Sequence, residues 1–176
     1  NNLNKKFKWS IIGQQVLMAQ VYLPTIFSNM NKTILPDYLH KYLKIGGANV
    51  PYNTDAWDGY PRERERLFRE LKKANSILVL TGDTHNSWIN NLYDENNNFI
   101  GVEIGTPAIS SPNTVDTFGS LTDGIEKGFI KENKNVKWTE GKHKGYTLLK
   151  LTKDKSEVIF VYVNTVKSKV YDVIDS

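Results

Sequence analysis

The sequence predicts an α/β (α+β) protein, because it combines a buried strand, an amphipathic helix and a β-rich tail. The strand is Ile77–Leu80, whose branched aliphatic side chains are typical of a strand covered on both faces. The helix spans residues 61–74, and Pro61 suits its first position. Its apolar face, at helical spacing, consists of Leu67, Phe68, Leu71 and Ala74. We expect this face to cover the sheet, with residues 1–176 forming a single domain or half-domain.

The amino-terminal third is predicted to hold one strand followed by a long irregular connection. The strand is Trp9–Gly13, and residues 14–20 either continue it or turn into a short helix. Residues 23–56 mix Pro, Asn and Gly with brief apolar patches, which is typical of an irregular excursion. Within it we expect a small helix over residues 36–43.

The carboxyl-terminal half is predicted to be mainly strands. The turn cluster Asp94–Asn98 separates Ile89–Leu92 from Phe99–Ile104, which indicates a hairpin or a helix-to-strand return. Residues 119–131 have a helical pattern, although two glycines weaken it. The tail is expected to form three strands, with a turn at residues 152–156 after the first: Tyr146–Leu151, Val158–Val163 and Lys169–Val173.

Composition limits the classes of function. The 176 residues are 39% hydrophobic, which is enough for a sizeable core, and no apolar segment approaches the roughly 18 residues needed to cross a bilayer. The net charge of +4 comes from basic residues scattered among 19 acids, so nucleic-acid binding is not expected. The chain has no cysteine, which excludes disulfides and thiolate metal ligands within these residues.

A possible metal-binding pair follows the buried strand directly. Gly82 allows a sharp turn, after which Asp83 and His85 leave the strand end as a carboxylate and an imidazole. Ligand sites in parallel sheets lie at the carboxyl ends of the strands, so these residues are candidate metal ligands. The alternative is structural, with Asp83 as the N-cap of a short helix whose apolar face includes Trp88 and Leu92.

A second candidate segment precedes the predicted helix. Asp55, Trp57 and Asp58 either line the rim of an active site or form a tight loop, and the two roles are compatible. In the structural alternative, Asp58 caps the helix that Pro61 opens, and Trp57 and Tyr60 pack beneath it.

Several segments together resemble the PhoD-like alkaline phosphatase and phosphodiesterase family, a branch of the calcineurin-like metallophosphoesterases. The stretch after the strand is similar to the family's Gly-Asp-x-His motif, and Asn53–Pro61 with Arg64 is similar to its Asp-x-Trp-Asp-Gly-Tyr-Pro-x-x-Arg signature. The resemblance extends from about Trp9 to about Val163 and includes three further segments: Trp9–Met18, Gly101–Ser111, and Asn135–Trp138 with Lys144–Tyr146.

The resemblance implies a fold and a reaction. The fold would be the carboxyl-terminal half of a metallophosphoesterase α/β/β/α sandwich with a β-rich tail. The reaction would be hydrolysis of phosphate mono- or diesters by a metal-activated water, with Asp83 and His85 as catalytic metal ligands and iron with calcium as the metals. It also implies an exported, extracytoplasmic enzyme.

The earlier metal motifs of the family have no counterpart in residues 1–60, so the missing amino-terminal part of the same enzyme is the expected partner. The isolated chain is therefore expected to be inactive. Thr106, Ser110 and Ser111 are weaker candidates for the pocket wall, while His40 and His143 are expected on the surface. The alternative from another class is a non-catalytic interaction or structural module, in which Asp83 is only a helix cap.

Overall fold

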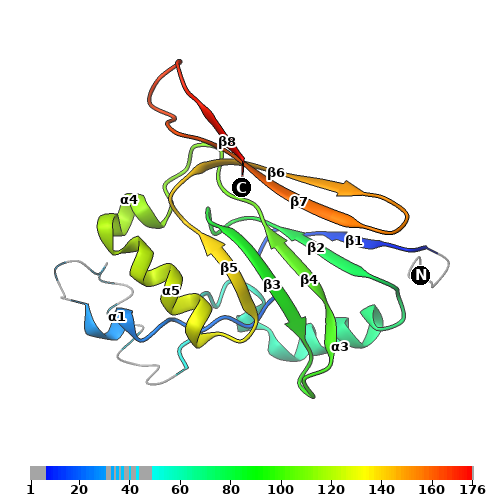
Figure 1. Cartoon of the computed structure of the whole chain (residues 1–176). Coiled ribbons are helices and arrows are strands. Elements are labelled where there is room, and N and C mark those ends of the chain that lie inside the picture. The colour runs from blue at the N-terminus through cyan, green and yellow to red at the C-terminus, as the bar shows by residue number, and fades with distance from the viewer. Residues whose placement is uncertain are drawn as a thin grey trace.

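A computed structural model describes residues 7–30, 33, 35, 37, 40, 43 and 49–175 (Figure 1). These residues form a mixed α/β structure with a five-stranded sheet, ordered β1-β2-β4-β3-β5, and a three-stranded sheet, ordered β6-β7-β8. The strands are β1 Ser10–Gly13, β2 Ile77–Thr81, β3 Ser87–Tyr93, β4 Phe99–Gly105, β5 Val136–Glu140, β6 Lys144–Leu151, β7 Ser156–Val163 and β8 Val173–Asp175. The helices are α1 Ile26–Asn29, α3 Pro61–Leu71, α4 Thr114–Phe118 and α5 Thr122–Glu132, with short 3-10 turns η1 Trp57–Gly59 and η2 Gly119–Leu121.

The predicted buried strand is confirmed as β2, which lies between β1 and β4 and runs parallel to both. Its side chains alternate between two apolar layers, as the period of two along a strand requires. Ile77 and Val79 belong to the core shared with the helices, whereas Leu78 belongs to a second core against the three-stranded sheet. Because β1, β2 and β4 are parallel, their carboxyl ends meet at one edge of the sheet.

The predicted amphipathic helix is confirmed as α3, although it ends at Leu71 rather than Ala74. Phe68 and Leu71 are each only 1% exposed, and Leu67 and Ala74 pack against the same core. Helix α5 contributes Ile125 and Phe129 to this core. The structure is therefore layered, with helices against the five-stranded sheet and the three-stranded sheet on its other face.

The hairpin expected around the Asp94–Asn98 turn is confirmed, because β3 and β4 pair in antiparallel register. The alternative of a short helix after Asp83 is wrong, since Ser87–Tyr93 forms β3 instead. Trp88, Asn90 and Leu92 are all fully buried along one face of this strand, which is the period of a strand and not of a helix. Asp83 therefore caps no helix.

Other elements differ from the expectations in their limits. Residues 14–20 form neither strand nor helix, and the last strand is β8 at Val173–Asp175 rather than residues 169–173. The two other tail strands and the helix near residues 119–131 are confirmed as β6, β7 and α5. The small helix expected over residues 36–43 involves positions outside the described residues. No helix in the described part of the chain is both long and apolar enough to cross a membrane.

Candidate active site at the carboxyl edge of the sheet

The segment that follows β2 adopts an uncommon backbone conformation. Asp83 has φ 66° and His85 has φ 63°, both in the left-handed region that residues with a side chain rarely occupy. The amide of Thr84 donates to the carbonyl oxygen of Gly82 at 2.8 Å, which closes a three-residue turn around Asp83. Backbone of this kind is concentrated at functional sites, where the surrounding structure holds it in place.

The turn is fixed by contacts from several other segments. The amide of Gly82 donates to the carbonyl oxygen of Gln15 at 2.9 Å, which ties the end of β2 to the segment after β1. The indole Nε1 of Trp88, a fully buried side chain, donates to the hydroxyl of Thr84 at 2.8 Å. These bonds hold the tip of the turn at the sheet edge while the Asp83 carboxylate remains exposed.

The ring of His85 is oriented by a backbone carbonyl. Its Nδ1 lies 2.7 Å from the carbonyl oxygen of Pro112. A carbonyl oxygen only accepts hydrogen bonds, so Nδ1 donates and the lone pair of the neutral ring lies on Nε2. This is the arrangement typical of metal-binding histidines, which donate their other ring N–H to a carbonyl or carboxylate.

The residues at the turn fit a metal ion as partial ligands. An exposed carboxylate and an oriented imidazole suit calcium and a transition metal respectively. Within the ranges that the structure describes, no group of three or more His, Asp or Glu side chains is placed to hold a metal ion. Asp83 and His85 thus remain a pair of candidate ligands.

The loop before α3 meets the end of β1 beside this turn. The indole Nε1 of Trp57 donates to Oε1 of Gln14 at 2.7 Å. Together with Asp55, which is exposed, these residues line an open hollow of about 400 Å³. Because Gln14 precedes Gln15, which bonds to Gly82, the hollow and the Asp83 turn occupy the same sheet edge.

Asp58 does not line that hollow and forms a buried ion pair instead. Its Oδ1 lies 2.6 Å from Nη1 of Arg64, and both side chains are less than a tenth exposed. Its Oδ2 accepts from the amide of Val21 at 2.9 Å. Burial raises the pKa of Asp58, against the opposing effect of Val21 and Arg64. Asp58 therefore fixes α3 to the segment after β1.

The structural alternative for this loop needs correction in two details. Asp58 is not the N-cap of α3; that position is Tyr60, and the cap has no side-chain hydrogen bond. Tyr60 does not pack beneath the helix, because its side chain is 58% exposed.

Glu103 is a residue that the sequence motifs contained but whose role we did not anticipate. Its carboxylate is fully buried on β4 and accepts from the amides of Met18 and Ala19, at 2.5 and 3.1 Å, and from Nδ2 of Asn90 at 2.9 Å. Burial raises the pKa of Glu103 to about 7 despite these donors. The only sequence signal was a charged residue within an otherwise apolar strand.

Of the weaker candidates, Thr106 and His143 have structural partners. Thr106 lies at the end of β4 and its hydroxyl bonds to that of Thr147 at 3.1 Å, while Ser110 and Ser111 are exposed. His143 is not a free surface residue: Nδ1 lies 2.9 Å from Oε1 of Glu140, and the ring lies 5.4 Å from that of Tyr162.

His40 is half-buried rather than on the surface as expected.

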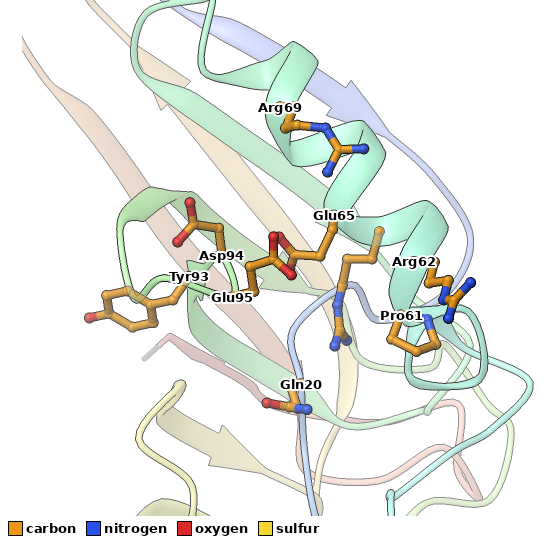
Figure 2. A pocket seen from close by; sticks show the side chains of 9 residues that line it. Gln20, Pro61, Arg62, Glu65, Arg69, Tyr93, Asp94 and Glu95 are labelled. Carbon is orange, nitrogen blue, oxygen red and sulfur yellow. The ribbon is translucent and has the colours of Figure 1, made fainter.

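A separate hollow of about 420 Å³ lies between α3 and the β3–β4 turn (Figure 2). Figure 2 shows arginines of α3 on one side and the carboxylates of Asp94 and Glu95 on the other, with Glu65 between them. Both signs of charge line it, and it is formed at the end of β3 rather than at the carboxyl edge of β2. We therefore do not assign the reaction to it.

Comparison with known proteins identifies the family that this chain resembles. The model of the PhoD-like phosphatase family matches residues 1–160. Alkaline phosphatase D of Bacillus subtilis (strain 168) is 30% identical over 160 residues, which are 86% of this chain and 23% of that protein. A solved structure described as "Structure of PhoD" superposes with a TM-score of 0.67 at 24% identity, covering 95% of this chain and 28% of the other. The chain thus spans about a quarter of the length of these relatives.

Proposed function

This chain belongs to the PhoD-like phosphatase family, and on that basis we propose that it supplies the Asp83–His85 metal-binding turn to a phosphate-ester hydrolase. Enzymes of this family are metal-dependent phosphoesterases. The observation that carries the assignment to these residues is the hydrogen bond between His85 Nδ1 and Pro112, which leaves Nε2 as the ligand atom. The exposed carboxylate of Asp83 lies two residues away on the same turn.

The metals that we propose are iron and calcium, following the family resemblance. When bound, they would polarise the phosphoryl oxygens and lower the pKa of a water nucleophile. The residues of this chain hold and orient the two proposed ligands. Pro112 fixes the imidazole of His85, and the Trp88–Thr84 bond fixes the turn that carries Asp83. Asp55 and Trp57 form a rim that could contact the substrate.

The proposed partner is the remainder of the same enzyme. A metal centre for phosphoryl transfer needs more ligands than one carboxylate and one imidazole, and we propose that an amino-terminal part of the enzyme provides them. In this proposal residues 1–176 form one half-domain, inactive alone, of an exported enzyme acting outside the cytoplasm.

Replacement of His85 in the complete enzyme tests the proposal. We expect His85→Ala to lower hydrolysis of phosphate esters at least 100-fold and to reduce bound metal, since a metal ligand is lost. Far-UV circular dichroism should be unchanged, because the side chain is only half-buried. A companion variant, Asp83→Asn, removes the charge of the other proposed ligand. Its control is Asp154→Asn, at an exposed position of the β6–β7 turn, which should keep full activity. Full activity in His85→Ala would remove this residue from the site.

A further inference from the structure

A second cavity adjoins the Asp83–His85 turn on the side of the helices. It is a half-open cavity of about 230 Å³, lined by residues of α1, α4, α5, the loop that contains Pro112, and Leu23 and Tyr52. Its wall at the sheet edge is formed by Thr84, which lies between Asp83 and His85, and by Pro112, whose carbonyl oxygen orients His85. The cavity therefore begins where the proposed metal ligands are.

The opposite walls of this cavity are aromatic. The rings of Phe27 and Phe118 are 5.5 Å apart at 75°, and those of Tyr52 and Phe129 are 5.2 Å apart at 82°. Phe27 also contacts Phe129 edge to face, with centroids 6.2 Å apart. Phe27 and Phe129 are only 3% and 2% exposed and form the floor of the cavity, whereas Tyr52 and Phe118 are half-buried and offer ring surface at its sides. A flat ring in the cavity can contact Tyr52 or Phe118 in the edge-to-face or offset geometry that aromatic pairs prefer.

The described residues that line the cavity include no charged side chain. This distinguishes it from the hollow beside α3, which arginines and carboxylates line (Figure 2). A phosphate dianion would lose its hydration here without gaining an opposite charge, whereas an apolar group would gain from leaving water. The volume is below the about 300–1,000 Å³ typical of pockets for drug-sized ligands, so one ring suits it better than a large ligand.

We propose that this cavity binds the compact, ring-bearing alcohol portion of the phosphate ester, while the phosphoryl group lies at the Asp83–His85 turn. The inference rests on the proposed function and extends it by naming a substrate class. The cavity accounts for the direction in which the ester lies: apolar end toward Phe27 and Phe129, anionic end toward the exposed carboxyl edge of the sheet.

Filling the cavity from its rim tests the binding step without catalysis. Thr117 is an exposed residue of α4 that lines the cavity, so Thr117→Trp places an indole there without removing a core side chain. Lys127→Trp, at an exposed position of α5 that does not line it, is the matched control. Binding of phenol to the 176-residue chain is measured by saturation-transfer NMR, and urea unfolding checks that each variant folds.

We expect phenol to bind the unmodified chain and the Lys127→Trp variant equally, and Thr117→Trp at least tenfold more weakly. Equal binding by all three chains, or no binding by the unmodified chain, would overturn the inference. If Thr117→Trp does not fold, Phe118→Ala replaces it, since that change removes a half-buried wall of the cavity and should weaken binding by a similar factor.

Kinetics of the complete enzyme separate the two proposals. For Thr117→Trp, kcat/KM should fall at least tenfold with phenyl phosphate and stay unchanged with methyl phosphate, which has no ring to place. An equal fall of kcat/KM with both esters rejects a ring-binding cavity but leaves the hydrolase assignment intact. The same conclusion follows if the unmodified enzyme has the same kcat/KM with butyl phosphate as with phenyl phosphate. Hydrolysis of neither ester by the unmodified enzyme, with phenol still bound, rejects the hydrolase and the placement of an ester here.

Discussion

The buried carboxyl of Glu103 makes the stability of this chain depend on pH in a direction opposite to that of most carboxylates. Burial raises its pKa from 4.5 to about 7 in the folded chain. Between these values the folded state binds a proton that the unfolded state has released, so the free energy of unfolding falls as pH rises. The contribution of Glu103 is complete below the unfolded pKa and is lost as pH passes through the folded pKa.

The size of this effect follows from the shift. A shift of one pKa unit corresponds to about 1.4 kcal/mol, so the shift of Glu103 amounts to about 3 kcal/mol as an order of magnitude. The negative charge of Asp58 also raises the pKa of Glu103, and Asp58 is itself paired with Arg64. A variant that removes only the titration of Glu103 is therefore the appropriate reference.

Urea unfolding of the unmodified chain and Glu103→Gln, from pH 4 to pH 8.5, measures the effect. The unfolding free energy of the unmodified chain minus that of Glu103→Gln should fall by up to about 3 kcal/mol between pH 4.5 and 7 and then level off. The Gln side chain keeps one oxygen that can accept from the amide of Met18, but it loses the acceptor that Ala19 and Asn90 use. That loss does not depend on pH, so it adds a constant to the difference and leaves its pH dependence to Glu103. A difference that stays flat, or that rises with pH, would refute the reasoning.

Three further predictions concern the residues that hold the site. Arg64→Met should lower the unfolding free energy by about 3–5 kcal/mol in urea titration, because it leaves the buried carboxylate of Asp58 unpaired; an exposed change such as Arg62→Met should have little effect. Asp83→Gly should leave stability unchanged or raise it by up to about 1 kcal/mol, since φ 66° suits glycine, yet abolish hydrolysis in the complete enzyme; a loss of stability like that of Asp154→Gly would contradict this. Calorimetric titration of the isolated chain with iron and calcium should show weak binding and no phosphatase turnover, and tight binding of two ions with turnover would disprove the half-site.

The sequence predicted the elements whose residues have a repeating pattern. The apolar run Ile77–Leu80 and the apolar positions of α3 indicate which residues are buried, because the apolar residues recur with the period of the strand or helix that they form. The turn of β3 and β4 was recognisable from its polar residues. Asp83 and His85 follow the end of β2, as expected, and their role as ligands stays a prediction, made because a strand end at a parallel edge is a common place for ligands.

The sequence could not reveal elements that depend on distant partners. Asn90 has a polar side chain on the buried face of β3, which interrupts the apolar alternation expected of a strand. Its Nδ2 donates to Glu103 on β4. Glu103 in turn accepts from amides of Met18 and Ala19, more than 80 residues earlier. A helix cap at Asp83 was plausible locally, but the burial of Trp88 and Leu92 in the sheet decided for a strand.

The turn at Asp83 and His85 depends both on its local sequence and on contacts with distant residues. Left-handed conformations at residues with side chains cost about 1–3 kcal/mol each, and glycine would avoid that cost. The turn instead keeps a carboxylate and an imidazole there, and bonds from Trp88, Gln15 and Pro112 hold them in place. A left-handed φ also occurs at Asn97 (φ 61°) in the β3–β4 turn, so the backbone conformation alone does not distinguish a ligand from a turn residue. The distinguishing contact is the bond from His85 Nδ1 to Pro112, which leaves Nε2 available two residues from the exposed Asp83, so that a metal ion would meet two ligands whose positions are set before it binds.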